Sequence, residues 1–298
     1  MDSTTARLLS DFGYCLKIER QMSPNTVDAY VSDCEAFFAS CGVSPGDVTA
    51  EDIEEYLASR SDDLSKRSQA RELSALRSFF DYLLMENERP DNPCDNVSAP
   101  KLGRYLPSVL SVEEVDAIIG SVQGSSPSAL RDRAILEILY GCGLRVSELC
   151  GLLISHVYVD DGFVRVVGKG SKERLVPLGE MAAEAFTAWL EVRGEPREPK
   201  YSDIAFLNRF GTPLSRVAVF NLVKKQALLA GVNKEISPHT FRHSFATHMI
   251  ENGADLRIVQ EMLGHESILT TEIYTHIDQA TWQEAVLSHH PRNLEDRQ

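Results

Sequence analysis

The chain has 298 residues, of which 43% are hydrophobic and 25% are charged, an ordinary balance for a globular protein. Its net charge of −14 argues against a surface that binds nucleic acid everywhere, but it leaves room for a local basic face. Because no run of 18 apolar residues exists and the N-terminal residues lack the pattern of a secretory signal, we expect a cytoplasmic protein.

Residues 1–100 are predicted to form a small helical bundle of four or five helices. One helix has clear boundaries: Ser23 is suited to the N-cap, Pro24 to the first helical position, and Gly42 to the position past the end. A second helix follows a capping-box spacing from Thr49 to Asp52.

A third strong helix starts at Ser65, with one apolar stripe formed by Leu73, Leu76, Phe80 and Leu83. Four basic residues fall largely off this stripe: Lys66, Arg67, Arg71 and Arg77. Taken alone, they are most simply a solvated charged face, and the functional alternative is a helix laid against DNA phosphates.

The stretch 96–111 holds two prolines and one glycine between helical patterns, which predicts a linker at residues 101–108. Residues 1–106 carry 11 Lys and Arg against 19 Asp and Glu, and the remaining residues carry 19 against 25. Both parts of the chain are therefore acidic overall.

Residues 109–298 are predicted to form a second, mainly α domain of the α+β kind. The stretch 162–178 reads as two short antiparallel strands joined by a Gly-rich turn, and residues 203–208 are predicted as a further strand. Helical patterns precede the strands at 111–120 and 126–143. Others follow them at 215–230, 238–252, 255–263, 268–275 and 281–288.

Two basic residues of this domain follow or lie between glycines. In "GCGLRVSELCGL", Arg145 stands at a helix start, where its guanidinium can face an oxyanion, and Glu148 can orient it. An i,i+3 pair of this kind is more often structural. In "GKGSKE", Lys169 is most simply an exposed hairpin tip, and its functional alternative is a general acid.

The segment "SPHTFRHSFATHMIENG" places His239 and Arg242 on one face near the positive end of a helix, where an anion is welcome. A metal site is the rival interpretation, since His243 follows His239 at i,i+4. However, Thr240 stands where a zinc protease helix has its glutamate. We expect no metal.

Near the C-terminus, "LGHESILTTEIYTH" sets Tyr274 between His265 and His276. Taken alone, the fourteen residues fit the end of an amphipathic helix, a metal site or a nucleophile. No ligand set surrounds the two histidines, and the choice depends on the basic residues upstream.

The order Arg, Lys, His-x-x-Arg, His, Tyr resembles the tyrosine site-specific recombinases of the phage integrase family. The resemblance covers nearly the whole chain. It rests on "GLRVSEL", "HTFRHSFATH" and "LGHESILTTEIYTH", with "SPNTVDAYVSDCEAFF" similar to the N-terminal core-binding domain. Length, layout and the tail "LSHHPR" most resemble the Xer branch, which resolves chromosome dimers at cell division.

The resemblance implies a role for each residue. Arg145 and Arg242 would hold the scissile phosphate, with His239 and His265 as further ligands and His239 as a proton acceptor. Lys169 would be the general acid and Tyr274 the nucleophile that forms a 3′-phosphotyrosine, on the way to a Holliday junction. Because that linkage retains the energy of the broken bond, resealing needs no ATP and no cofactor.

The implied partners are a double-stranded DNA recombination site and a homo- or hetero-tetramer with a paralogous recombinase. A DNA-translocase activator at the septum is a further implied partner, and a bacterial nucleoid is the implied location. The apolar face of 281–288 would dock on a neighbouring subunit or on the chain's own core. A phage or transposon integrase, or a non-catalytic DNA-binding protein of the same fold, remains the alternative.

Overall fold

The computed structural model describes residues 2–99, 109–168, 172–264 and 288–291. These residues form two compact units, which divide between Tyr105 and Leu106. No helix in the described ranges is long and apolar enough to cross a membrane.

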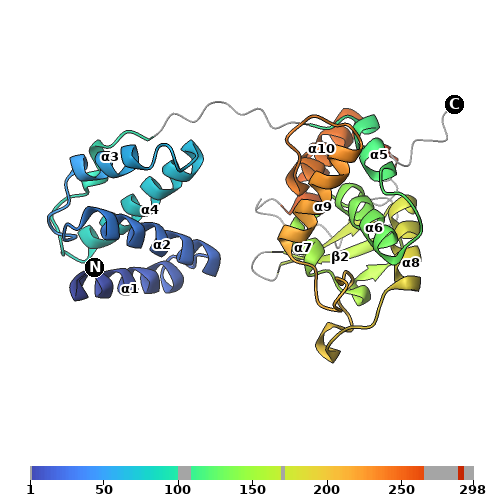
Figure 1. Ribbon diagram of the computed structural model, residues 1–298, viewed down its shortest axis with the longest axis horizontal. Coiled ribbons are helices and arrows are strands. Elements are labelled where there is room, and N and C mark those ends of the chain that lie inside the picture. Colours follow the sequence, from blue (N-terminus) through green and yellow to red (C-terminus); the bar gives the residue numbers. More distant parts are fainter. Residues whose placement is uncertain (1, 100–108, 169–171, 265–287, 292–298) are drawn as a thin grey trace. The chain divides into compact units, whose positions relative to one another are not determined.

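The first unit is a helical bundle (Figure 1). Its helices are α1 (Ser3–Ile18), α2 (Pro24–Cys41), α3 (Ala50–Ser59), α4 (Lys66–Met85) and the short 3-10 helix η1 (Pro93–Asn96). Their packing depends on aromatic side chains: the rings of Phe12 and Phe38 meet that of Phe79 edge to face, with centroids 5.3 and 5.5 Å apart. All three are essentially buried, so the core of this unit lies among α1, α2 and α4.

The helix boundaries of this unit follow the predicted capping residues. Ser23 caps α2, and Gly42 ends it in the left-handed conformation with φ +64°. Thr49 and Asp52 form the capping box of α3. The predicted apolar stripe of α4 is wholly buried, which confirms that this face turns toward the core.

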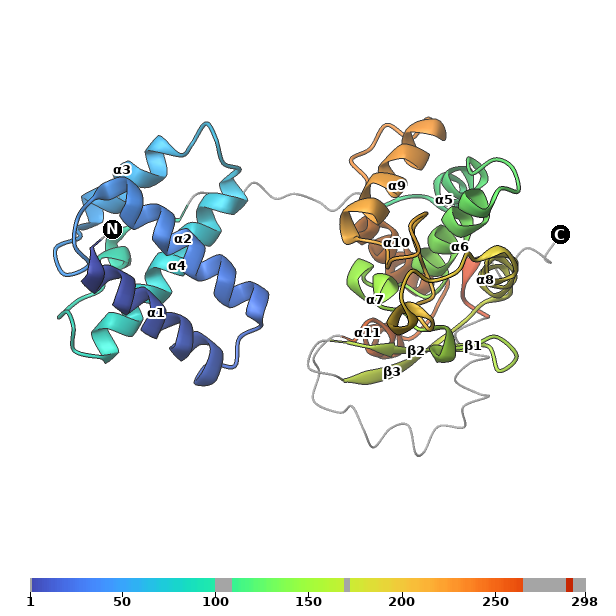
Figure 2. The same cartoon turned by 60° about the horizontal axis from the view of Figure 1, so that its bottom comes forward.

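The second unit surrounds the central helix α6 (Pro127–Gly141), which packs against α8 (Glu180–Val192) and α10 (Pro238–Glu251). The other helices are α5 (Val112–Gly120), α7 (Val146–Cys150), α9 (Arg216–Leu229) and α11 (Leu256–Leu263), with 3-10 turns η2 (Ile154–His156) and η4 (Pro199–Tyr201). The sheet β1 (Val157–Tyr158), β2 (Phe163–Val167) and β3 (Glu173–Pro177) is antiparallel in the order β1-β2-β3, and it lies along one side of the unit (Figure 2). The predicted mainly helical fold with a small antiparallel sheet is confirmed.

Two local predictions differ from the structure. The strand predicted at 203–208 is absent, because this segment makes only isolated bridges, Leu153 with Ile204 and Leu207 with Pro213. Ala205, Phe206 and Leu207 are buried without a ladder, and the side chain of Asn208 folds onto the following turn. The structure also contains α8, for which no helix was predicted although its residues favour one.

Candidate active site

Arg145 is the N-cap residue of α7, directly after a glycine turn. Gly143 has φ +58°, and a Cβ at this position would lie 2.5 Å from the ring of Phe245, so the turn requires glycine. Glu148 accepts hydrogen bonds from the Arg145 backbone N–H at 2.8 Å and from its Nη1 at 2.9 Å. The i,i+3 pair expected from the sequence is therefore present.

The same carboxylate binds a second arginine, which we did not predict. Arg174 of β3 donates Nη1 to Oε1 and Nη2 to Oε2 of Glu148, each at 2.9 Å. The backbone of Arg174 pairs with that of Val166 on β2, and the side chains of Arg174 and Val166 are both buried. The sequence did hold one signal for this burial. Arg174 and Val176 are two residues apart on the strand and so lie on the same, buried face.

Arg242 reaches the same place from the first turns of α10, whose start at Ser237 and Pro238 follows the prediction. Its Nη1 donates to the Gly143 carbonyl at 2.7 Å, and its Nη2 donates to the Leu263 carbonyl. Nη1 also lies 3.9 Å from Oε2 of Glu148. Three arginines from three elements thus share one carboxylate.

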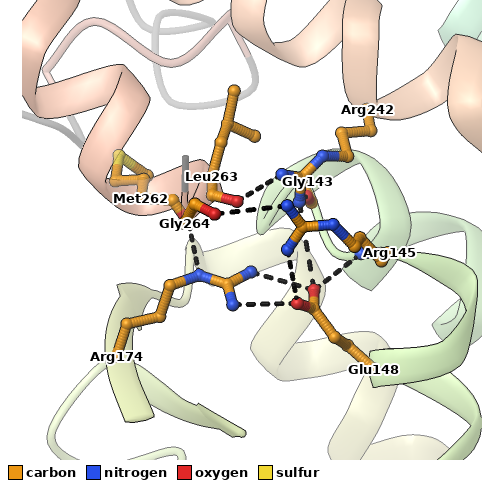
Figure 3. A network of polar contacts seen from close by, with 8 residues as sticks. All are labelled: Gly143, Arg145, Glu148, Arg174, Arg242, Met262, Leu263 and Gly264. Atoms are coloured by element: carbon orange, nitrogen blue, oxygen red, sulfur yellow. Dashed lines mark hydrogen bonds and ion pairs between the residues drawn. The ribbon is translucent and has the colours of Figure 1, made fainter. Parts of the chain in front are cut away.

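The C-terminal end of α11 completes this group (Figure 3). Three successive carbonyls each accept a hydrogen bond from a different arginine: Met262 from Arg174, Leu263 from Arg242 and Gly264 from Arg145. The last carbonyls of a helix carry partial negative charge, so cations are favoured here. Figure 3 shows the guanidinium groups gathered between Glu148 and this helix end.

The charges of the group depend on one another. Burial acts to raise the pKa of Glu148, but the hydrogen bonds and charge of Arg174, together with the hydrogen bonds of Arg145, outweigh it and hold the pKa below its usual value. Burial, followed by the charge of Arg145, lowers the pKa of Arg242 to about 10. Arg242 therefore remains protonated at neutral pH.

The other predicted site residues are placed unequally. His239 lies in the first turn of α10 with an exposed side chain, whereas Arg242 in the next turn is buried. Lys169, His265 and Tyr274 lie outside the described residues, as do His276 and the helices predicted at 268–275 and 281–288. His248 is buried, with Nδ1 2.8 Å from the Tyr140 hydroxyl.

The basic residues of α4 also differ in their surroundings. Lys66, Arg67 and Arg71 are exposed, and Arg71 donates to Asp33 at 2.9 Å. Arg77 is half-buried and donates to the Cys94 carbonyl at 3.1 Å. Three of the four therefore lie on a surface open to solvent, and the fourth holds η1 against α4.

Family comparisons match both units. The model described as "Phage integrase family" matches residues 108–281, and the one described as "Phage integrase, N-terminal SAM-like domain" matches residues 9–87. The chain therefore belongs to the phage integrase family, as the sequence resemblance indicated.

Individual relatives narrow this assignment. The chain is 47% identical over 294 residues to the tyrosine recombinase XerD of Chlorobaculum tepidum, which covers 96% of this chain and 97% of that protein. It is 42% identical over 291 residues to XerD of Halalkalibacterium halodurans, covering 95% and 97%. Within the family it is a XerD-like tyrosine recombinase, an enzyme of site-specific recombination.

Solved structures agree in fold. The crystal structure of XerA recombinase matches with TM-score 0.51 and 30% identity, covering 97% of this chain and 99% of that one. The XerH recombinase bound to a palindromic difH substrate, in a post-cleavage complex, matches with TM-score 0.69 and 25% identity, covering 93% and 83%.

Proposed function

We propose that this recombinase cuts strands of duplex DNA with Tyr274, holds each broken end as a 3′-phosphotyrosine and rejoins it to a new partner through a Holliday junction. Its proposed task is the resolution of chromosome dimers at cell division. The observation that carries the chemistry is the pair of arginines, Arg145 and Arg242, held together by Glu148 and the end of α11. The XerH substrate complex supports cleavage of DNA by a protein of this fold.

The two arginines suit the charge that develops during cleavage. Attack on a phosphodiester builds additional negative charge on the non-bridging oxygens, and fixed donors stabilise that charge without a metal. A guanidinium has five N–H donors, and contacts among the described residues use only part of this set on each arginine. Arg145, with 37% of its side chain exposed, is open to a phosphate.

The remaining roles belong to the same proposal. Tyr274 attacks the phosphorus, and its phenol proton passes to a base, for which exposed His239 is our candidate. The 5′ oxygen leaves with a proton from Lys169, and His265 binds a non-bridging oxygen. In the reverse step a 5′ hydroxyl attacks the phosphotyrosine and releases Tyr274.

A nicked duplex tests the nucleophile, because loss of the short strand beyond the cut traps the covalent product. We expect the wild type to form a protein–DNA adduct that maps to Tyr274 by peptide mass spectrometry. Tyr274→Phe should form none, while Tyr158→Phe, a matched removal of a hydroxyl on β1, should react like the wild type. An adduct of normal yield with Tyr274→Phe would exclude this nucleophile.

The leaving group tests Lys169 separately. Lys169→Ala should slow cleavage about 100- to 10,000-fold, since it removes a general acid. A 5′-bridging phosphorothiolate leaves without protonation and should recover much of the rate. Equal defects on both substrates would remove Lys169 from the acid role.

We assign DNA contact to both parts of the chain: residues 1–100 as a core-binding domain, 101–108 as a linker and 109–298 as the catalytic domain. The exposed cations of α4 are our candidates for phosphate contacts in the first domain. The proposed assembly is a tetramer, of identical subunits or with a paralogous recombinase, under the control of a DNA translocase. Mass photometry on the recombination site, with and without a second recombinase, distinguishes the two compositions.

A further inference from the structure

Arg174 is enclosed, whereas Arg145, which binds the same carboxylate, is partly open to solvent. Its side chain is 7% exposed, compared with 37% for that of Arg145. Arg242 is also buried, but of the three arginines around Glu148 only Arg174 has, within the described residues, hydrogen bonds from all three of its guanidinium nitrogens, two of them to one carboxylate, which leaves it least free to bind a DNA phosphate. Its function must be sought in what it holds.

The contacts of Arg174 use all three guanidinium nitrogens. Two of them bind the two oxygens of Glu148 at 2.9 Å, a bidentate geometry that fixes the plane of the carboxylate. The third, Nε, donates to the Met262 carbonyl at 2.6 Å. Arg174 therefore ties β3 to α7 and to the end of α11 through one rigid planar group.

Two glycines lie directly against this group. A Cβ built on Gly264 would lie 3.3 Å from Arg174 Nη1, and one built on Gly168 would lie 3.6 Å from the same atom and 3.8 Å from Oε1 of Glu148. Gly264 immediately precedes His265, and Gly168 immediately precedes Lys169. The guanidinium therefore lies beside both glycines, at the two points where the described chain continues to a proposed site residue.

We propose that Arg174 is a positioning residue for strand cleavage. It holds the Glu148 carboxylate where that group orients Arg145, and it holds the end of α11 against the same carboxylate. This inference rests on the proposed function, because it requires Arg145 to act on the scissile phosphate. A lysine at position 174 would keep the charge but lose the planar fork, so charge and geometry are separable.

The test compares Arg174→Lys with Glu173→Gln in the full-length chain. Glu173 is the exposed neighbour on the same strand, where it pairs loosely with Arg165 at 3.7 Å. Single-turnover adduct formation is measured on the nicked duplex and normalised to the protein that binds DNA, so partial unfolding does not imitate a slow step. We expect Arg174→Lys to react about 100-fold more slowly with little change in Kd, and Glu173→Gln to behave as the wild type.

A second substrate separates positioning from a purely structural role. An uncharged methylphosphonate at the scissile position needs less positive charge, so Arg145→Ala should lose less rate on it than on the phosphate. Arg174→Lys should show the same partial recovery, since it acts through Arg145. Equal defects of Arg174→Lys on the two substrates would overturn the inference. A wild-type rate for Arg174→Lys, together with an Arg174→Gln variant that does not fold, would also overturn it and leave Arg174 a structural role.

The same experiment keeps the two proposals apart. Absence of a Tyr274 adduct in the wild type would refute the proposed function whatever position 174 contains. A normal wild-type adduct together with a wild-type rate for Arg174→Lys would refute only the positioning role.

Discussion

Each unit of this recombinase has arginines clustered around buried carboxylates, and the two clusters differ in how completely the carboxylates are bonded. In the second unit, both oxygens of Glu148 accept hydrogen bonds from arginine side chains. In the first, Arg71 binds one oxygen of Asp33 at 2.9 Å, and Arg60 lies 3.6 Å from one oxygen of Glu72. The second oxygens of Asp33 and Glu72 have no hydrogen-bond partner among the described residues.

The ionisation of the carboxylates reflects this difference. Burial raises the pKa of Asp33 and of Glu72 despite the nearby arginines. Around Glu148 the arginines outweigh burial and lower the pKa. The comparison teaches that burial alone does not decide whether a carboxylate keeps its charge, because a complete set of donors can reverse its effect.

The largest expected difference between the clusters is in catalysis. Arg242→Ala should slow adduct formation about 100- to 1,000-fold, as expected for loss of one charged donor at the transition state. Arg60→Ala, the matched removal from the first cluster, should leave the single-turnover rate of the bound complex unchanged. A comparable loss of rate in both variants would show that the division of labour is wrong.

The next difference is in stability. Glu148→Gln leaves three arginines close together without their anion and should lower the free energy of unfolding by about 3 kcal/mol. Glu72→Gln removes a charge that burial already disfavours and should change it by less than about 1 kcal/mol. Denaturant unfolding of the intact chain, followed by circular dichroism, measures both, and equal losses would contradict the contrast.

A smaller effect is expected for the exposed member of the first cluster. Arg71 is 52% exposed, so Arg71→Gln should weaken DNA binding modestly and reduce the salt dependence of log Kd by about one ion. Titrations of duplex DNA at several salt concentrations measure the slope. An unchanged slope would show that Arg71 makes no phosphate contact and serves only as the ion-pair partner of Asp33.

The smallest effect is a difference in pH dependence. A raised pKa means that folded Asp33 and Glu72 bind protons more readily than the unfolded chain. Each group therefore contributes stability below its ordinary pKa, which is 3.8 for Asp33 and 4.5 for Glu72. That contribution is lost as the pH rises through the raised pKa of the folded state. Glu148 behaves oppositely: its contribution is present above pH 4.5 and is lost as pH falls through its lowered pKa.

Amide hydrogen exchange on the intact chain resolves the two units in one sample. Glu72→Gln should remove part of the pH dependence of exchange protection in α4 above pH 4.5. Glu148→Gln should remove part of the pH dependence of exchange protection in α7 below pH 4.5. Removed pH dependences of the same sign in α4 and in α7 would contradict the opposite pKa directions assigned to Glu72 and Glu148.

Local chemistry was the part of the fold that the sequence could predict. Ser23, Gly42 and the Thr49–Asp52 pair mark helix boundaries through contacts within a few residues, and all of them are observed. The strand prediction for residues 203–208 was wrong because the central residues of the segment are buried without pairing in a ladder. Apolar periodicity responds to burial and cannot show whether a neighbouring strand is present.

For the site, the order of residues along the chain predicted the family, whereas only some of the contacts could be predicted. The Arg145–Glu148 pair was accessible because it spans one helical turn. Arg174 was not, because its partners Glu148 and Met262 are 26 and 88 residues away in the sequence. The catalytic roles of all six residues remain predictions: Arg145, Lys169, His239, Arg242, His265 and Tyr274.

The three carbonyls at the end of α11 have a consequence for the entropy of DNA binding. Immobilising one long arginine side chain costs about 2 kcal/mol of conformational free energy. Here Arg145 and Arg242, the two arginines proposed to hold the phosphate, are bonded to carbonyl groups at the end of α11. Much of that ordering is therefore completed when the protein folds, and a phosphate that arrives has fewer rotamers left to freeze.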